Sequence, residues 1–197
     1  MGVAASSPLS ADIKAIQKWK WTQVMASIKT YNENEFPFGI TTTNIVTMTG
    51  MSEAEAKQLV QLLSKQPDTG VVNALTVLSA LLCLGDVASG SVDARIEILF
   101  DLVDFDGTAQ VTHDELVILF LSCGTALAGI QGAAAGATAT TTPDDAMCRR
   151  LVGQLYQELE MPTSDRLAKN DFTAWAISFL SELQEINIDN VYASLYH

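Results

Sequence analysis

Four carboxylates and several other oxygen atoms fall within one short segment, residues 104–115, called here the acidic loop, and three of the carboxylates stand at positions that suit a metal ion. Asp104 and Asp106 occupy the first and third positions of this twelve-residue stretch, and Glu115 occupies the twelfth. Ca²⁺ is a hard cation that takes six to eight oxygen ligands, and a twelve-residue loop can wrap it with ligands at positions 1, 3, 5, 7, 9 and 12. The spacing therefore predicts a calcium site.

The positions between these carboxylates also offer oxygen. Thr108 supplies a hydroxyl or carbonyl at position 5, and Gln110 supplies its carbonyl at position 7. Thr112 serves position 9, directly or through water, and also caps the helix from which Glu115 reaches back as a bidentate ligand. The predicted metal ligands are Asp104, Asp106, Thr108, Gln110, Thr112 and Glu115.

Two features of the acidic loop predict weak binding. Position 6 is Ala109, and a residue with a Cβ needs about 1–2 kcal/mol to adopt a left-handed backbone, which would weaken binding about tenfold. Position 5 lacks a carboxylate, so Mg²⁺ is expected to share the site at rest. The alternative is a loop that keeps its shape and closes through internal hydrogen bonds without metal.

The run Asp-Phe-Asp-Gly-Thr-Ala-Gln-Val-Thr-His-Asp-Glu-Leu resembles the loop of the EF-hand calcium-binding superfamily. The resemblance implies helix–loop–helix units that pair through an apolar residue at position 8, which is Val111 in this chain. Three degenerate loops offer partners at the same position, namely Ile40, Val72 and Leu167. These loops cover residues 33–44, 64–76 and 160–171, and unrelated helical hairpins are the alternative interpretation of the first two.

The layout resembles a calmodulin-like chain with four hands, of the neuronal calcium sensor and calcineurin B branch. It implies an all-α fold with two lobes of paired EF-hands, one hand near-consensus and three degenerate. The N-terminal lobe is expected over residues 10–86 and the C-terminal lobe over 92–183, joined by a flexible segment rich in small residues. Helices are predicted within 10–31, from 52 to 66, and over 73–84, 92–103, 114–122, 144–159 and 172–183.

Segments outside these units carry their own expectations. Residues 124–142 consist mostly of Ala, Gly and Thr, which predicts a mobile insert, with an Ala-rich helix as the alternative. Residues 1–9 are expected to be a flexible N-terminus, and 184–197 a tail or a docking helix. Gly2 and Ser6 match the acceptor pattern for N-myristoylation, although small residues alone would also explain this start.

Composition excludes several classes of function. A net charge of −12 disfavours nucleic acid and favours cations or basic protein segments as partners. Two histidines and three dispersed cysteines provide no zinc-ligand spacing, and the cysteines are expected to be reduced, mostly buried thiols. His113, at loop position 10, is expected at the surface. No catalytic constellation is visible in the sequence, so we do not expect an enzyme.

Two functions follow from these features. The first is a calcium-binding regulatory protein that exposes a groove for the amphipathic helix of a target protein. The second is a constitutive, largely calcium-independent EF-hand adaptor in a cytoskeletal or ciliary/flagellar assembly. Either would be cytoplasmic, and acylated Gly2 would add membrane contact.

Overall fold

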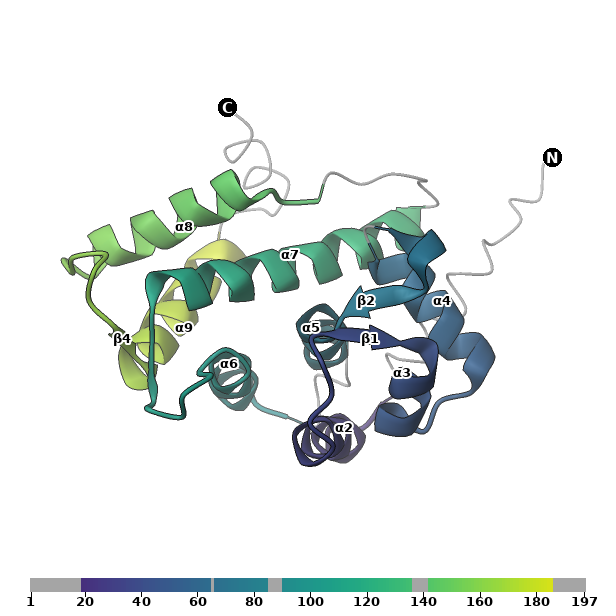
Figure 1. Cartoon of the computed structure of the whole chain (residues 1–197). Helices are drawn as coiled ribbons and strands as arrows, with labels where there is room; N and C mark the ends of the chain where they lie inside the picture. Colours follow the sequence, from purple (N-terminus) through teal and green to yellow (C-terminus); the bar gives the residue numbers. More distant parts are fainter. Residues whose placement is uncertain (1–18, 65, 85–89, 136–141, 186–197) are drawn as a thin grey trace.

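The computed structural model describes residues 19–64, 66–84, 90–135 and 142–185 (Figure 1). Most of these residues are helical, which confirms the all-α class. The first half contains α2 (Trp21–Glu33), β1 (Gly39–Thr41), α3 (Thr42–Thr49), α4 (Glu53–Leu63), the 3-10 turn η1 (Pro67–Thr69), β2 (Val71–Asn73) and α5 (Ala74–Leu84). The second half contains α6 (Val92–Asp101), β3 (Gln110–Val111), α7 (His113–Ala135), α8 (Asp145–Glu158), β4 (Leu167–Ala168) and α9 (Lys169–Glu185).

Some expectations fall on other residues. The described residues do not include the flexible N-terminus with Gly2 or the first part of the helix predicted from residue 10. They also do not include most of the joint at 85–91 or the tail from residue 186.

Side-chain caps start several helices. Ser52 and Glu55 form a reciprocal capping box at α4, and Asp144 accepts a hydrogen bond from the Met147 backbone at α8, as predicted. Helix α3 has no counterpart among the predicted helices, because its threonine-rich run has little helix propensity. Its ends are nevertheless fixed, by Thr41 at the start and by Gly50 at the end, where φ is 72°.

Two short antiparallel strand pairs join the helices. Ile40 of β1 lies opposite Val72 of β2, and Val111 of β3 lies opposite Leu167 of β4. All four side chains are buried. The apolar residues expected at position 8 of the four loops therefore face each other in two pairs.

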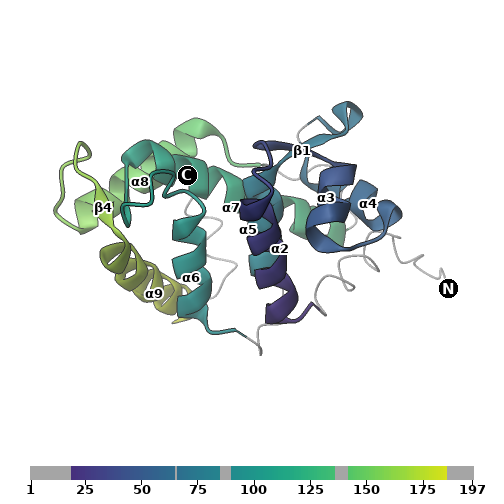
Figure 2. The ribbon, with the colours of Figure 1, turned by 60° about the horizontal axis from the view of Figure 1, so that its bottom comes forward.

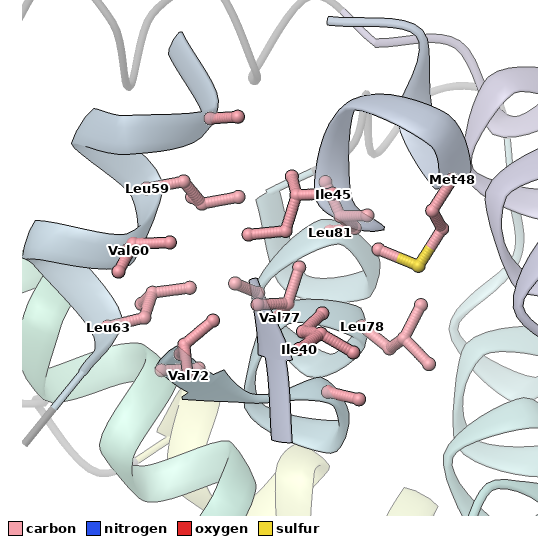
Figure 3. Packing of buried hydrophobic residues seen from close by; sticks show 14 of the residues in the cluster. Ile40, Ile45, Met48, Leu59, Val60, Leu63, Val72, Val77, Leu78 and Leu81 are labelled. Atoms are coloured by element: carbon pink, nitrogen blue, oxygen red, sulfur yellow. The ribbon is translucent and has the colours of Figure 1, made fainter. Parts of the chain in front are cut away.

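The buried side chains form two clusters. The first surrounds Ile40 and Val72, which meet side chains of α3, α4 and α5 (Figure 3). The second surrounds Val111 and Leu167 and contains the fully buried Phe100 and Tyr156. Each cluster also contains a residue from the other half of the chain: Ala126 of α7 belongs to the first cluster, and Leu75 of α5 belongs to the second.

Helix α7 connects the two halves of the molecule. It runs from the α8 end toward α4 and packs against α5 and α8 (Figure 1), while Figure 2 shows β4 and α4 near opposite ends. The prediction of a mobile insert over 124–142 was therefore wrong up to residue 135, where the alternative, an Ala-rich helix, is found. Small side chains permit a close approach, since a Cβ on Gly129 would lie 2.7 Å from the Leu62 carbonyl oxygen.

Length and composition alone would allow part of α7 to cross a membrane. Among the described residues, the stretch from His113 to Gly132 has a mean hydropathy of 1.5, and 44% of it is buried inside the protein. A core helix meets the same criteria, so this feature does not decide between the two.

The cysteines differ in exposure. Cys148 is buried and Cys123 is half-buried, whereas Cys83 is exposed, so the expectation of mostly buried thiols was wrong for Cys83. Cys83 and Cys123 are free thiols.

Candidate functional site

The acidic loop is anchored where α6 ends. The Asp104 amide donates to the Phe100 carbonyl at 3.1 Å, and the side chains of Phe100 and Val103 are buried beneath it. The loop then turns through Gly107, whose amide donates to the Asp104 carbonyl at 3.3 Å. It ends in β3 and the first turn of α7, so packed elements hold both ends.

Two residues of the loop have left-handed backbones. Gly107 has φ of 67° and Ala109 has φ of 56°. Glycine adopts this conformation without a steric cost, whereas alanine does not. Ala109 therefore takes the strained conformation that its place at position 6 predicted.

The first two carboxylates fold inward onto the loop backbone. Asp104 accepts hydrogen bonds from the amides of Thr108, at 3.1 Å, and Ala109, at 2.8 Å. Asp106 accepts from the Thr108 hydroxyl at 2.7 Å, and that hydroxyl also approaches the Gln110 carbonyl at 3.2 Å. Four of the predicted ligands thus form one hydrogen-bonded group.

Thr112 and Glu115 form a second group at the start of α7. The amide and hydroxyl of Thr112 donate to Glu115 Oε2 at 2.7 and 2.8 Å, and the Glu115 amide donates to the Thr112 hydroxyl at 3.3 Å. This is the capping box expected at that position. One oxygen of Glu115 is therefore engaged within the protein.

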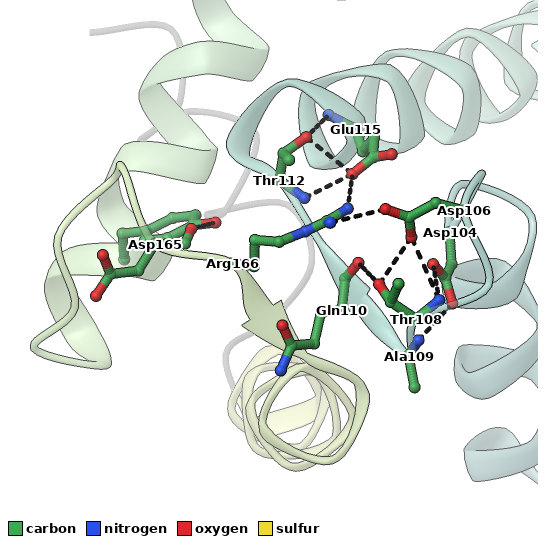
Figure 4. Close-up of polar contacts among 10 residues, drawn as sticks. Asp104, Asp106, Thr108, Ala109, Gln110, Thr112, Glu115, Asp165 and Arg166 are labelled. Atoms are coloured by element: carbon green, nitrogen blue, oxygen red, sulfur yellow. Dashed lines mark hydrogen bonds and ion pairs between the residues drawn. The ribbon is translucent and has the colours of Figure 1, made fainter.

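Arg166 lies between these two groups (Figure 4). Its Nη1 donates to Asp106 Oδ2 at 2.7 Å, and its Nη2 lies 3.6 Å from Glu115 Oε2. Hydrogen bonds from the Thr108 hydroxyl and from Arg166 lower the pKa of Asp106 to about 2. The hydrogen bond to Asp106, together with the charges of Asp106, Glu115 and Asp104, raises the pKa of the Arg166 guanidinium.

Arg166 was not among the predicted site residues. The available signal was its register: it directly precedes Leu167, and Leu167 was the expected partner of Val111. A residue beside the paired position of one loop lies near the other loop, so its charge could have been considered.

The six predicted ligands of the acidic loop fit Ca²⁺ in type and in order, since each supplies an oxygen atom and the backbone has the required shape. The arrangement of these side chains differs in one respect from that of a loop wrapped around a calcium ion. Within the described ranges, no three Asp, Glu, His or Cys side chains form a group that could hold a metal ion. The three carboxylates do not converge because Glu115 is held by Thr112 and because Arg166 stands between Glu115 and Asp106.

The other three loops close with different chemistry. Thr41 and Asn44 form a neutral capping box at α3, and Asn73 accepts from the Leu75 amide at 2.8 Å. In the 160–171 loop, Glu160 has φ of 54° and the Met161 amide donates to the Tyr156 carbonyl at 2.9 Å, which is a helix-terminating turn. Each of these contacts joins neutral groups.

His113 was expected at the surface, but its side chain is only 21% exposed. Its ring lies 5.9 Å from that of the buried Tyr156, and its Nδ1 lies 3.6 Å from an Asp114 oxygen. His113 therefore contributes to the packing between α7 and α8.

Comparison of the sequence with models of protein families finds no match, and comparison with the curated proteins finds no similar sequence.

Proposed function

We propose that this chain is a calmodulin-like EF-hand protein that binds one Ca²⁺ ion in the acidic loop and engages a helix of a target protein. Asp104, Asp106 and Glu115 would supply the carboxylates. Thr108, Gln110 and Thr112 would supply neutral oxygens, with Thr112 acting directly or through water. No residue is assigned to catalysis.

One observation carries this proposal. The acidic loop is paired across an antiparallel register in which Val111 lies opposite Leu167, and helices flank both loops. A second pair, with Ile40 opposite Val72, repeats the arrangement in the other half. An apolar residue at the same position of each of four loops supports descent from one repeating helix–loop–helix unit rather than unrelated hairpins.

An open cavity between β2 and α7 supports a protein partner. Its volume is about 410 Å³, and Phe38, Leu63, Val71 and Leu121 contribute to its lining. Phe38 is 54% exposed and meets Phe105 of the acidic loop edge to face, with ring centroids 5.4 Å apart. Polar residues such as Thr76 and Thr125 also line it, so both faces of an amphipathic helix would find contacts here, and basic residues on that helix would suit the charge of −12.

The constitutive adaptor is the second candidate. The observations that favour it are the left-handed backbone of Ala109 and the absence, among the described residues, of three acidic side chains grouped to hold a metal ion. A protein of this kind would hold its partner regardless of calcium. Its location in a cytoskeletal or ciliary assembly, and acylation of Gly2, stay predictions.

Calcium titration by calorimetry tests the first candidate against the second. The wild-type protein would be compared with Glu115→Gln, which removes a bidentate ligand while preserving the side-chain shape. Glu97→Gln is the matched control, because Glu97 is exposed on α6 and its substitution removes the same charge.

Binding to the wild type and to Glu97→Gln, with binding lost in Glu115→Gln, would support the calcium-binding protein. Equal binding to all three proteins would place the ion elsewhere and reject the acidic loop. The absence of binding at millimolar calcium would leave the adaptor as the better account.

A further inference from the structure

We propose that Arg166 is a built-in competitor for the cation of the acidic loop: its guanidinium takes the place of the metal between Asp106 and Glu115, and calcium must displace it. This inference rests on the proposed function, because it concerns how the same loop is regulated. It adds a residue from outside the acidic loop and a link to the 160–171 loop.

The contact geometry carries the first step. Arg166 Nη1 reaches Asp106 Oδ2 at 2.7 Å while Nη2 lies 3.6 Å from Glu115 Oε2, so two nitrogens of one planar group face two predicted ligands (Figure 4). A guanidinium presents its N–H groups as a fixed fork, which suits it to bridge two carboxylates. The side chain of Arg166 is 34% exposed and that of Glu115 is 14% exposed, so water screens this contact only in part.

Competition follows from shared atoms and from charge. Calcium would need oxygens of Asp106 and Glu115 that Arg166 and Thr112 now occupy. A divalent cation at this point would also repel the guanidinium, because like charges a few ångströms apart are unfavourable. The guanidinium and the ion therefore exclude each other from the space between the two carboxylates.

The environment of Arg166 indicates that the carboxylates hold it in place. Its Nε is buried and has no hydrogen-bond partner within the part of the chain that the structure describes. A buried donor without a partner is unfavourable, so this position is stabilised by the contacts of Nη1 and Nη2. Once calcium takes the carboxylates, little else retains the side chain there.

Release of Arg166 would act on the second loop of the pair. Arg166 directly precedes Leu167 of β4, and the adjacent Asp165 carbonyl accepts a hydrogen bond from the buried Tyr156 hydroxyl at 3.1 Å. A change at Arg166 is therefore transmitted to β4 and to the segment between α8 and β4. The 160–171 loop would respond to calcium without binding the ion itself.

Calorimetric titration with CaCl₂, after removal of metal with EGTA, tests this inference. Arg166→Gln removes the charge and the fork, and Arg150→Gln is the control, since Arg150 is exposed on α8 and its loss changes the net charge equally. We expect Arg166→Gln to bind calcium about tenfold more tightly than the wild type, and Arg150→Gln to change the affinity less than about twofold. Without calcium, Arg166→Gln should melt at a lower temperature than Arg150→Gln, because two carboxylates lose their counter-charge.

The outcomes separate the inference from the proposed function. Tighter binding in Arg166→Gln, or measurable binding in that variant alone, would support competition. Equal or weaker binding than in the wild type would overturn competition while leaving the calcium site in place. No binding by any of the proteins at millimolar calcium would overturn the calcium site and the competition together. If Arg166→Gln does not fold, Arg166→Lys keeps the charge but not the fork, and an affinity equal to that of the wild type would count against bridging.

Discussion

In the β1–β2 pair, neutral side chains close the loops: the Thr41 amide donates to Asn44 Oδ1 at 2.9 Å. At the equivalent place in the β3–β4 pair, the Thr112 amide donates to the carboxylate of Glu115 at 2.7 Å, and Arg166 adds a positive charge. Both pairs nevertheless bury one apolar residue from each strand. Burial therefore maintains the backbone in both pairs, whereas charge distinguishes the pair that we propose to bind a cation.

The two strand pairs place their left-handed turns in the same way. Gly70 lies two residues before Val72 and has φ of 67°, and Ala109 lies two residues before Val111 and has φ of 56°. Glu35 and Glu160 instead take left-handed backbones just after α2 and α8, with φ of 48° and 54°. Each strand pair thus joins one loop that turns before its strand to one that turns directly after a helix.

The largest expected effect concerns the buried strand residues. Ile40→Ala and Leu167→Ala should each lower the free energy of unfolding by about 3 kcal/mol, because each leaves a cavity beside a fully buried partner. Urea unfolding followed by circular dichroism measures both. A large loss in one variant and none in the other would show that the two strand pairs do not depend equally on burial.

A smaller effect concerns the crossing of α7 over α4. Gly129→Ala should destabilise the protein by about 1–2 kcal/mol, because the new Cβ would meet the Leu62 carbonyl at 2.7 Å. Gly153→Ala on α8 is the control, since its Cβ would have nothing within 4 Å and should stabilise the helix by about 0.5–1 kcal/mol. Thermal and urea unfolding of both variants measure the difference. If both stabilise the protein, α7 does not approach α4 this closely.

The left-handed turns allow a reciprocal exchange. Gly70→Ala should lower the free energy of unfolding by about 1 kcal/mol, because its new Cβ would be strained at positive φ. Ala109→Gly should raise that free energy by about 0.5–1 kcal/mol for the opposite reason. Denaturant unfolding in EGTA measures both without a contribution from calcium. Changes of the same sign in the two variants would contradict the equivalence of the turns.

The smallest effect concerns surface charge. Lys169 of α9 lies 2.8 Å from Asp101 of α6, with its side chain 25% exposed, whereas Lys57 pairs with Glu53 within α4 and is 62% exposed. Lys169→Met should destabilise the protein by about 0.5–1 kcal/mol, and Lys57→Met by about 0.3 kcal/mol. Both losses of unfolding free energy should be smaller at high NaCl than at low NaCl, because salt screens the ion pairs. An equal loss of unfolding free energy in both variants at every salt concentration would contradict the expected difference between the two ion pairs.

Sequence patterns predicted the elements that local chemistry determines. The capping box of Ser52 and Glu55 marked the start of α4, and the four apolar residues at the expected position 8 are those that pair. Patterns failed where distant contacts decide the outcome. Residues 124–135 are mostly small and offer few large apolar side chains, yet they belong to the helix α7, which packs on α4 and α5.

The candidate site divides in the same way. Thr112 and Glu115 were predictable as a local pair, because a capping box spans four residues. Arg166 was not, because it reaches Asp106 across 60 residues of chain. The residue types in a loop indicate which ion it can bind, but the neighbouring loop determines what those side chains contact.

Helix α7 starts with Glu115 in its first turn and ends against α4. Its 23 residues span about 35 Å, so a tilt of α7 at the acidic loop would move its other end. Spin labels at Asp93 and Leu127 would measure its tilt as a change in distance on adding calcium. A rotation of about 5° at Glu115 would displace the far end by about 3 Å, and Leu121 and Thr125, which line the cavity beside β2, by about 1 Å. If the acidic loop binds calcium as we propose, the position of α7 would thus link that loop to the cavity beside β2.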